Sequence, residues 1–113
     1  MSKTRKTEIS IEVELDDNHV PEKMVWNAQD GGIRDQETKA VLLSVWDDKN
    51  KEALRLDLWT KEMPMDDMKQ FFHQIFISMA DSYKRATSED ETANEIIEFA
   101  ENFAHKAGIK GNK

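Results

Sequence analysis

Two runs of alternating residues, 40–46 and 53–59, constrain the fold of this chain more than any other feature of its sequence. If Lys49 and Asn50 form the turn between them, one antiparallel register places the aliphatic residues of both runs on the same face. The predicted pairs are Val41 with Leu58, Leu43 with Leu56 and Val45 with Leu54. Because a shift of either run by one residue would break this match, the sequence predicts a β-hairpin with a defined register and six aliphatic side chains buried together.

The opposite face of this predicted hairpin mixes large apolar and charged side chains. Its pairs are Trp46 with Ala53, Ser44 with Arg55, Leu42 with Asp57 and Ala40 with Trp59. The two Trp residues lie at opposite ends, about six residues or ~20 Å apart, so they would act as separate anchors for a partner. Alternatively, a loop such as 27–37 covers this face and the Trp side chains are structural.

The first third of the chain predicts two more strands. Residues 8–15 alternate strictly between polar and apolar side chains, which is typical of a half-buried strand. A shorter strand is expected at 23–26 after Pro21, and residues 27–37, which contain Asp30-Gly31-Gly32, are expected to form a loop.

The last third has the spacing of two amphipathic helices. Pro64 suits the first position of a helix, and apolar residues follow at i, i+3 and i+4 from Met65 to Tyr83. Ser88 and Glu91 have the spacing of a capping box for a second helix, and Gly108 would end it.

Strands followed by helices predict an α+β fold, a four-stranded antiparallel meander with two helices packed on one face. We expect a single domain at 8–108, a disordered basic tail at 1–7 and a second basic tail at 109–113. A chain of 113 residues is long enough for one such core.

Charge is distributed unevenly. The net charge is −7, but six of the sixteen basic residues lie in the segments 1–6 and 106–113, so residues 7–105 carry −13. This field repels phosphate backbones and anionic lipids, which argues against nucleic-acid binding and favours a protein partner with a basic patch. No segment is apolar enough for membrane insertion, and the lack of cysteine agrees with a cytoplasmic location.

Residue patterns for catalysis or metal binding are weak. Glu101 and His105 are one helical turn apart but have no third ligand nearby in the sequence, and His19 is expected in a turn. His73 is expected at the edge of the first helix's apolar stripe. The paired acidic residues all fall at predicted turns or helix starts, where acids cap or solubilise. We therefore expect no enzyme activity, no cofactor and no metal.

The motifs described so far, taken together, resemble the gliding-motility protein family GldC. The likeness runs from about residue 8 to residue 105, and its most specific part is the run from Leu56 to Gln74. The residues that carry it are Val20-Pro21-Glu22-Lys23, Trp26, Asp30-Gly31-Gly32, Leu43-Ser44-Val45-Trp46-Asp47, Leu56-Asp57-Leu58-Trp59-Thr60-Lys61, Met63-Pro64 and Met68-Lys69-Gln70-Phe71-Phe72-His73-Gln74. The resemblance implies a small cytoplasmic accessory protein that supports surface motility and the associated adhesin machinery, without catalytic residues.

The leading hypothesis is a non-enzymatic interaction protein that docks proteins of the gliding machinery through the hairpin and the corner from Trp59 to Pro64, with a homodimer as a further expectation. Its candidate contact residues are Leu42, Trp46, Arg55, Trp59, Lys61, Phe71 and His73. The alternative is a small-molecule-binding domain or an enzyme without a recognisable motif, with a pocket between sheet and helices near Phe71 and His73.

Overall fold

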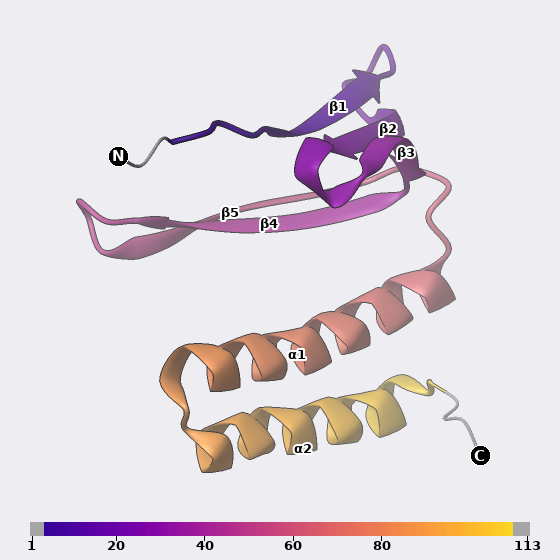
Figure 1. The fold of residues 1–113 in the computed structure, drawn as a ribbon. Coiled ribbons are helices and arrows are strands. Elements are labelled where there is room, and N and C mark those ends of the chain that lie inside the picture. The colour runs from indigo at the N-terminus through magenta and orange to yellow at the C-terminus, as the bar shows by residue number, and fades with distance from the viewer. Residues whose placement is uncertain (1–3, 110–113) are drawn as a thin grey trace. The chain divides into compact units, whose positions relative to one another are not determined.

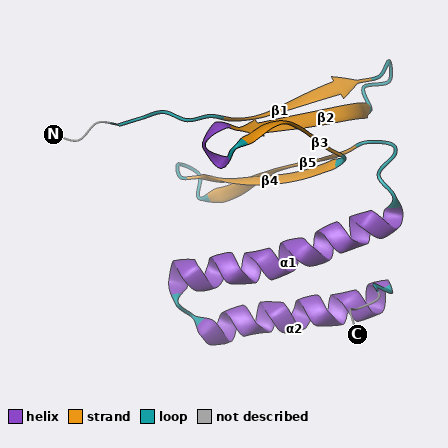
Figure 2. Cartoon of the chain, turned by 45° about the vertical axis from the view of Figure 1, so that its right-hand side comes forward, coloured by secondary structure: helices purple, strands orange, loops and turns teal. Residues whose placement is uncertain are grey.

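A computed structural model describes residues 4–109 of the chain (Figure 1). The chain divides into two compact units, one up to Met63 and the other from Pro64 onward. All the strands described lie in the first unit, and both long helices lie in the second (Figure 2). Each unit is therefore described by itself.

The first unit contains a three-stranded antiparallel sheet with the order β1-β2-β3. Its strands are β1 (Ile9–Leu15), β2 (Pro21–Ala28) and β3 (Ile33–Thr38). The middle strand β2 carries Met24, which is fully buried. The strands expected at 8–15 and 23–26 are thus present, although β2 is twice as long as its brief apolar alternation indicated.

Strand β3 was not expected, because its segment was predicted to be a loop. The chain leaves β2 through a short 3-10 helix, η1 (Gln29–Gly31), and turns at Gly32, whose φ of 71° favours glycine. It then pairs along β2 from Ile33 to Thr38. Most of β3 is polar and exposed, so its pairing depends on backbone hydrogen bonds that leave no apolar period in the sequence.

A second sheet consists of the hairpin β4 (Ala40–Asp47) and β5 (Glu52–Trp59). All seven predicted cross-strand pairs are confirmed, from Ala40 opposite Trp59 to Trp46 opposite Ala53. The turn is stabilised by Asp47, whose Oδ1 accepts hydrogen bonds from the N–H groups of Lys49 at 3.1 Å and Asn50 at 3.4 Å. Lys51 closes the turn with a φ of 56°.

The second unit is a helical hairpin of α1 (Met65–Thr87) and α2 (Asp90–Ala107). The helices run antiparallel, since Nζ of Lys69 near the start of α1 donates to the carbonyl oxygen of Ala107 at the end of α2 (3.0 Å). Small residues allow close approach, and Ala80, Ala93 and Ala100 are buried. The ring of Phe76 lies edge-on to two rings of α2, Phe99 at 5.2 Å and Phe103 at 5.1 Å.

The ends of the helices differ from the prediction at two points. Pro64 is the N-cap residue, one position before the helix, rather than the first helical residue. The capping box of Ser88 and Glu91 is absent: Ser88 ends α1 with a φ of 62°, and Glu89 precedes α2 without a side-chain cap. Ser88 therefore belongs to the end of the first helix. Gly108 ends α2 with a φ of 79°, as expected.

The α+β class is confirmed, but the strands form two antiparallel sheets of three and two strands rather than one sheet of four. The packing of the helices on a sheet face and the single domain at 8–108 stay predictions. Residues 1–3 and 110–113, the greater part of the two predicted tails, lie outside the described residues. Neither helix within 4–109 combines the length and apolar character of a membrane span.

Candidate interaction surface

The β4–β5 hairpin presents two faces that differ in chemistry. We call the first the tryptophan face; its members are Ala40, Leu42, Ser44, Trp46, Ala53, Arg55, Asp57 and Trp59. We call the second the aliphatic face; its members are Val41, Leu43, Val45, Leu54, Leu56 and Leu58. Both sets follow directly from the register, because successive side chains of a strand point to opposite faces.

The tryptophan face is open at both of its aromatic residues. The exposed fractions are 61% for Trp46, near the turn, and 53% for Trp59, at the base of the hairpin. Leu42 is half-buried between them along β4. These exposures favour the interpretation of the Trp residues as anchors over the alternative in which segment 27–37 covers them.

Arg55 and Asp57 form the charged centre of the tryptophan face. Nε of Arg55 lies 3.7 Å from Oδ2 of Asp57, and the side chains are 65% and 50% exposed. An ion pair this exposed contributes little to stability. Both groups therefore remain available to a partner.

Most side chains of the aliphatic face are not covered by the rest of the first unit. Leu43, Val45, Leu54 and Leu56 are each between 44% and 53% exposed, whereas Val41 and Leu58 at the base are half-buried. The six side chains do gather on one face, as the register requires, and packing of the helices on that face stays a prediction. The alternation of residues along the two strands predicts which side chains share a face. It does not predict which other part of the protein, or which partner, covers that face.

Lys61 is held in place by the turn between β1 and β2. Its Nζ lies 2.7 Å from Oδ2 of Asp16 and 3.5 Å from Oε2 of Glu22, and its N–H donates to the carbonyl oxygen of Pro21 at 3.3 Å. The hydrogen bond from Lys61 and the N–H groups of Val20 and Asn18 lower the pKa of Asp16 from 3.8 to about 2. The same hydrogen bond from Asp16 raises the pKa of Lys61. This clamp fixes the chain where β5 ends.

Phe71 and His73 lie on α1 in the second unit, and both are half-buried. Phe71 borders a shallow hollow of about 310 Å³ on one side of the helix. The hollow is lined by Phe71, Gln74, Ile75, Ser78, Met79 and Ser82. His73 does not line it.

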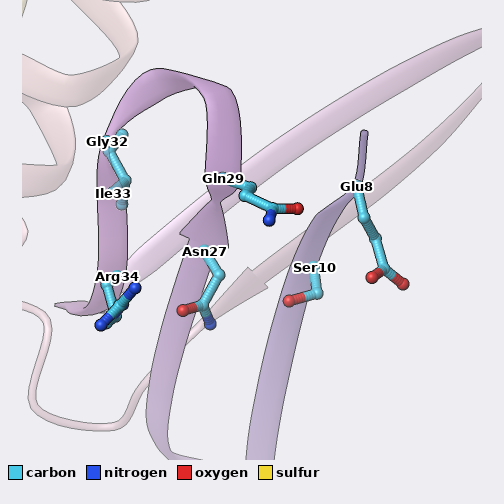
Figure 3. Close-up of a pocket in the computed structure, with 7 residues that line it drawn as sticks. All are labelled: Glu8, Ser10, Asn27, Gln29, Gly32, Ile33 and Arg34. Carbon is cyan, nitrogen blue, oxygen red and sulfur yellow. The ribbon is translucent and has the colours of Figure 1, made fainter. Parts of the chain in front are cut away.

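A larger hollow of about 420 Å³ lies at the end of the three-stranded sheet (Figure 3). Its lining residues are Glu8, Ser10, Asn27, Gln29, Gly32, Ile33 and Arg34. The neighbouring Asp30 accepts two hydrogen bonds from the guanidinium of Arg5, at 3.2 and 2.8 Å. The sequence singled out Asp30-Gly31-Gly32 but did not predict the hollow, which requires the β2–η1–β3 path.

Within residues 4–109, no three His, Asp or Glu side chains come together as a metal site would require. The expectations that the chain binds no metal or cofactor and is not an enzyme stay predictions.

Comparison with known proteins adds the family. The profile of the family described as "Gliding motility-associated protein GldC-like" matches residues 21–109. The chain belongs to the GldC-like family. No curated protein and no solved structure matches it.

The GldC-like match begins at Pro21, not near residue 8, and ends at Ile109. It includes β2 to α2 and all seven candidate contact residues, whereas β1 and Asp16 lie outside it. The family thus confirms the resemblance and an association with gliding motility. It names no partner and no reaction.

Proposed function

We propose that this chain is a non-enzymatic accessory protein of gliding motility, which acts in the cytoplasm and binds proteins of the machinery that moves surface adhesins. The observation that carries the proposal is the tryptophan face, where Trp46 and Trp59 stand more than half exposed at opposite ends of a hairpin inside the GldC-like match. Exposed Trp residues are frequent energetic centres of protein interfaces. Arg55 between them adds a side chain that is also enriched in such centres.

The charge of the chain favours a basic partner surface. Residues 7–105 carry −13, which speeds association with a positive patch and repels nucleic acid. The proposal also includes self-association into a homodimer. Lys61 is a contact residue with a second role in the clamp, whereas Phe71 and His73 are candidate contacts on the second unit.

The experiment compares protein capture by two double variants. Trp46→Ala with Trp59→Ala removes both anchors, and we expect at least about a tenfold loss of partner recovery from lysate of a gliding bacterium. The matched control is Ile9→Ala with Leu15→Ala, which truncates two exposed apolar residues of β1 outside the family match and is expected to leave recovery unchanged.

Circular dichroism first establishes that both variants are folded. Full recovery with the folded Trp variant would show that this surface is not where partners bind. Equal losses in both variants would point to a general effect of apolar truncation. When the two double variants are expressed in a strain that lacks the gene, the control variant should restore colony spreading and the Trp variant should not.

A small-molecule-binding function is the second candidate, and the polar hollow at Asn27 and Arg34 favours it (Figure 3). Its lining offers amide, hydroxyl, carboxylate and guanidinium groups to a polar ligand. A saturable rise in melting temperature with one metabolite, abolished by Arg34→Ala, would support it. A flat response across a broad metabolite library would leave the interaction protein as the better account.

A further inference from the structure

The outer edge of β5 differs from the other strand edges of this molecule. Within residues 4–109, β5 pairs with β4 and with no other strand, so its second edge is unpaired. The β4–β5 register runs from Ala40 to Asp47 without a bulge, whereas both pairings of the other sheet contain a register shift. Natural edge strands are commonly protected by bulges, prolines or clusters of like charge. β5 has neither a bulge nor a proline, and it carries one basic and one acidic residue near its centre.

The hydrogen bonds of the hairpin show which backbone groups face this edge. The N–H of Thr60 donates to the carbonyl oxygen of Lys39 at 2.9 Å, which continues the β4–β5 ladder by one pair. Hydrogen-bonded and non-hydrogen-bonded pairs alternate along an antiparallel ladder. The residues that turn N–H and C=O outward are therefore Ala53, Arg55, Asp57 and Trp59.

Charge then selects one register for two copies of β5 in antiparallel order. A two-fold axis at Leu56 places Arg55 of each copy opposite Asp57 of the other. The same axis pairs residues whose backbone N–H and C=O groups face outward in both copies, as a ladder requires. An axis at Arg55 would place two guanidinium groups opposite each other, and an axis at Asp57 would do the same with two carboxylates. Like charges directly opposite destabilise a sheet.

The Leu56 register also matches side-chain size and chemistry. Leu54 would lie opposite Leu58 of the other copy, and Ala53 opposite Trp59, so the small residue faces the large one. About eight backbone hydrogen bonds would form over the strand. The edge of β4 offers no such selection, because its outward residues are uncharged.

We propose that a second copy of this chain is the partner of the β5 edge, and that two β5 strands pair in antiparallel order about an axis at Leu56. The two hairpins then form one four-stranded sheet. This inference deepens the proposed function, on whose self-association it rests, by naming the strand edge and the register through which two copies pair. It also removes a free strand edge that would otherwise favour aggregation.

The first experiment uses single cysteines, because the natural chain has none. In Leu56→Cys the two sulfur atoms would meet at the axis, in a non-hydrogen-bonded pair whose Cβ separation suits a disulfide. Leu54→Cys is the matched control, because Leu54 lies on the same strand and face as Leu56 and the two side chains are 50% and 48% exposed. In the proposed register, however, the Leu54 positions of the two copies lie ~13 Å apart.

We expect disulfide-linked dimer from Leu56→Cys under mild oxidation, and at least about tenfold less from Leu54→Cys. Leu43→Cys tests the competing edge, since a β4–β4 pairing about an axis at Leu43 would join the two Leu43 positions. Equal linkage at Leu54 and Leu56, or dominant linkage at Leu43, would overturn the proposed register.

The second experiment exchanges the charges. Arg55→Asp and Asp57→Arg each place like charges opposite one another, so each should raise the dimer dissociation constant about tenfold or more. The double variant Arg55→Asp with Asp57→Arg restores opposite charges and should restore the dimer. Mass measured by light scattering up to about 500 µM gives the dissociation constants, with folding checked by circular dichroism.

Outcomes for the two proposals are distinguishable. A wild-type protein that stays monomeric over this range would overturn the dimer and leave protein capture by the tryptophan face intact. A double variant whose dimer dissociation constant is no lower than that of the single variants would likewise contradict the register. A dimer with no capture of other proteins would instead refute the proposed docking function.

Discussion

At the scale of single residues, Asp16 and Lys61 form the shortest ion pair within residues 4–109, at 2.7 Å. The Asp16 side chain is 15% exposed and accepts hydrogen bonds from the N–H groups of Asn18 and Val20, both in its own turn. Lys61 approaches the same carboxylate from the end of β5. The pair therefore joins two segments 45 positions apart in the sequence.

The lowered pKa of Asp16 predicts a pH dependence of stability. The pKa of Asp16 falls from 3.8 in the unfolded chain to about 2 on folding. The ionised carboxylate therefore makes its full contribution to the free energy of unfolding at pH values above 3.8, and this contribution is lost as the pH falls toward 2. Asp16→Asn should therefore lower the free energy of unfolding at pH 7. The difference from wild type should shrink between about pH 5 and pH 2.

Urea unfolding of wild type and Asp16→Asn across this pH range measures the difference. Asp17→Asn is the control, since Asp17 is an exposed neighbour in the same turn. A constant gap between wild type and Asp16→Asn at all pH values would show that the side chain acts through shape and not through its charge.

At the scale of elements, the register of the β4–β5 hairpin was predictable, whereas its turn spans residues 48–51 instead of Lys49 and Asn50 alone, and β3 was not predicted. Six aliphatic residues on two facing strands admit one register, so Val41 and Leu58 were paired correctly from the sequence. β3 holds Ile33 as its one large aliphatic residue, and its pairing with β2 rests on backbone groups that every sequence supplies. Among the candidate contact residues, Trp46 and Trp59 were singled out because they are large aromatic residues on a mixed face of the hairpin, and their contact with a partner stays a prediction.

The junction between the helices shows where the sequence predicted a capping box that the structure lacks. Ser88 adopts a φ of 62° as it ends α1, which costs a residue with a Cβ atom more than it costs glycine. Ser88→Gly should therefore raise the free energy of unfolding by ~0.5–1 kcal/mol. A capping box would give the opposite sign, with a loss of about a few tenths of a kcal/mol.

Chemical unfolding followed by helical circular dichroism separates these signs. Glu91→Ala provides the control, because Glu91 makes no cap in the structure and its truncation should change stability by less than ~0.5 kcal/mol. A clear loss in both variants would restore the capping box and contradict the helix ends described above.

At the scale of the whole molecule, the chain is an acidic GldC-like protein of two units, each of which carries large apolar side chains on its surface. Leu56 and Trp46 on the hairpin, and Phe99 on α2, are each about half exposed or more. Sequence patterns located these side chains because periodicity reports which residues share a face. They could not predict the exposure, since cover depends on partners and on long-range packing that no local pattern encodes.

The central claim is that the tryptophan face is open and serves as the binding surface, and fluorescence quenching tests its first half directly. Two double variants each retain one hairpin Trp: Trp26→Phe with Trp59→Phe leaves Trp46, and Trp26→Phe with Trp46→Phe leaves Trp59. A third, Trp46→Phe with Trp59→Phe, leaves the half-buried Trp26 as the internal reference. Acrylamide is the quencher, because a neutral molecule is not repelled by the acidic body.

The account predicts that Trp46 and Trp59 are quenched more strongly than Trp26, and that purified partner protein, once captured, protects both of them. Quenching of Trp46 and Trp59 no stronger than that of Trp26 in the free chain would mean that the face is covered, and it would contradict the account at its centre.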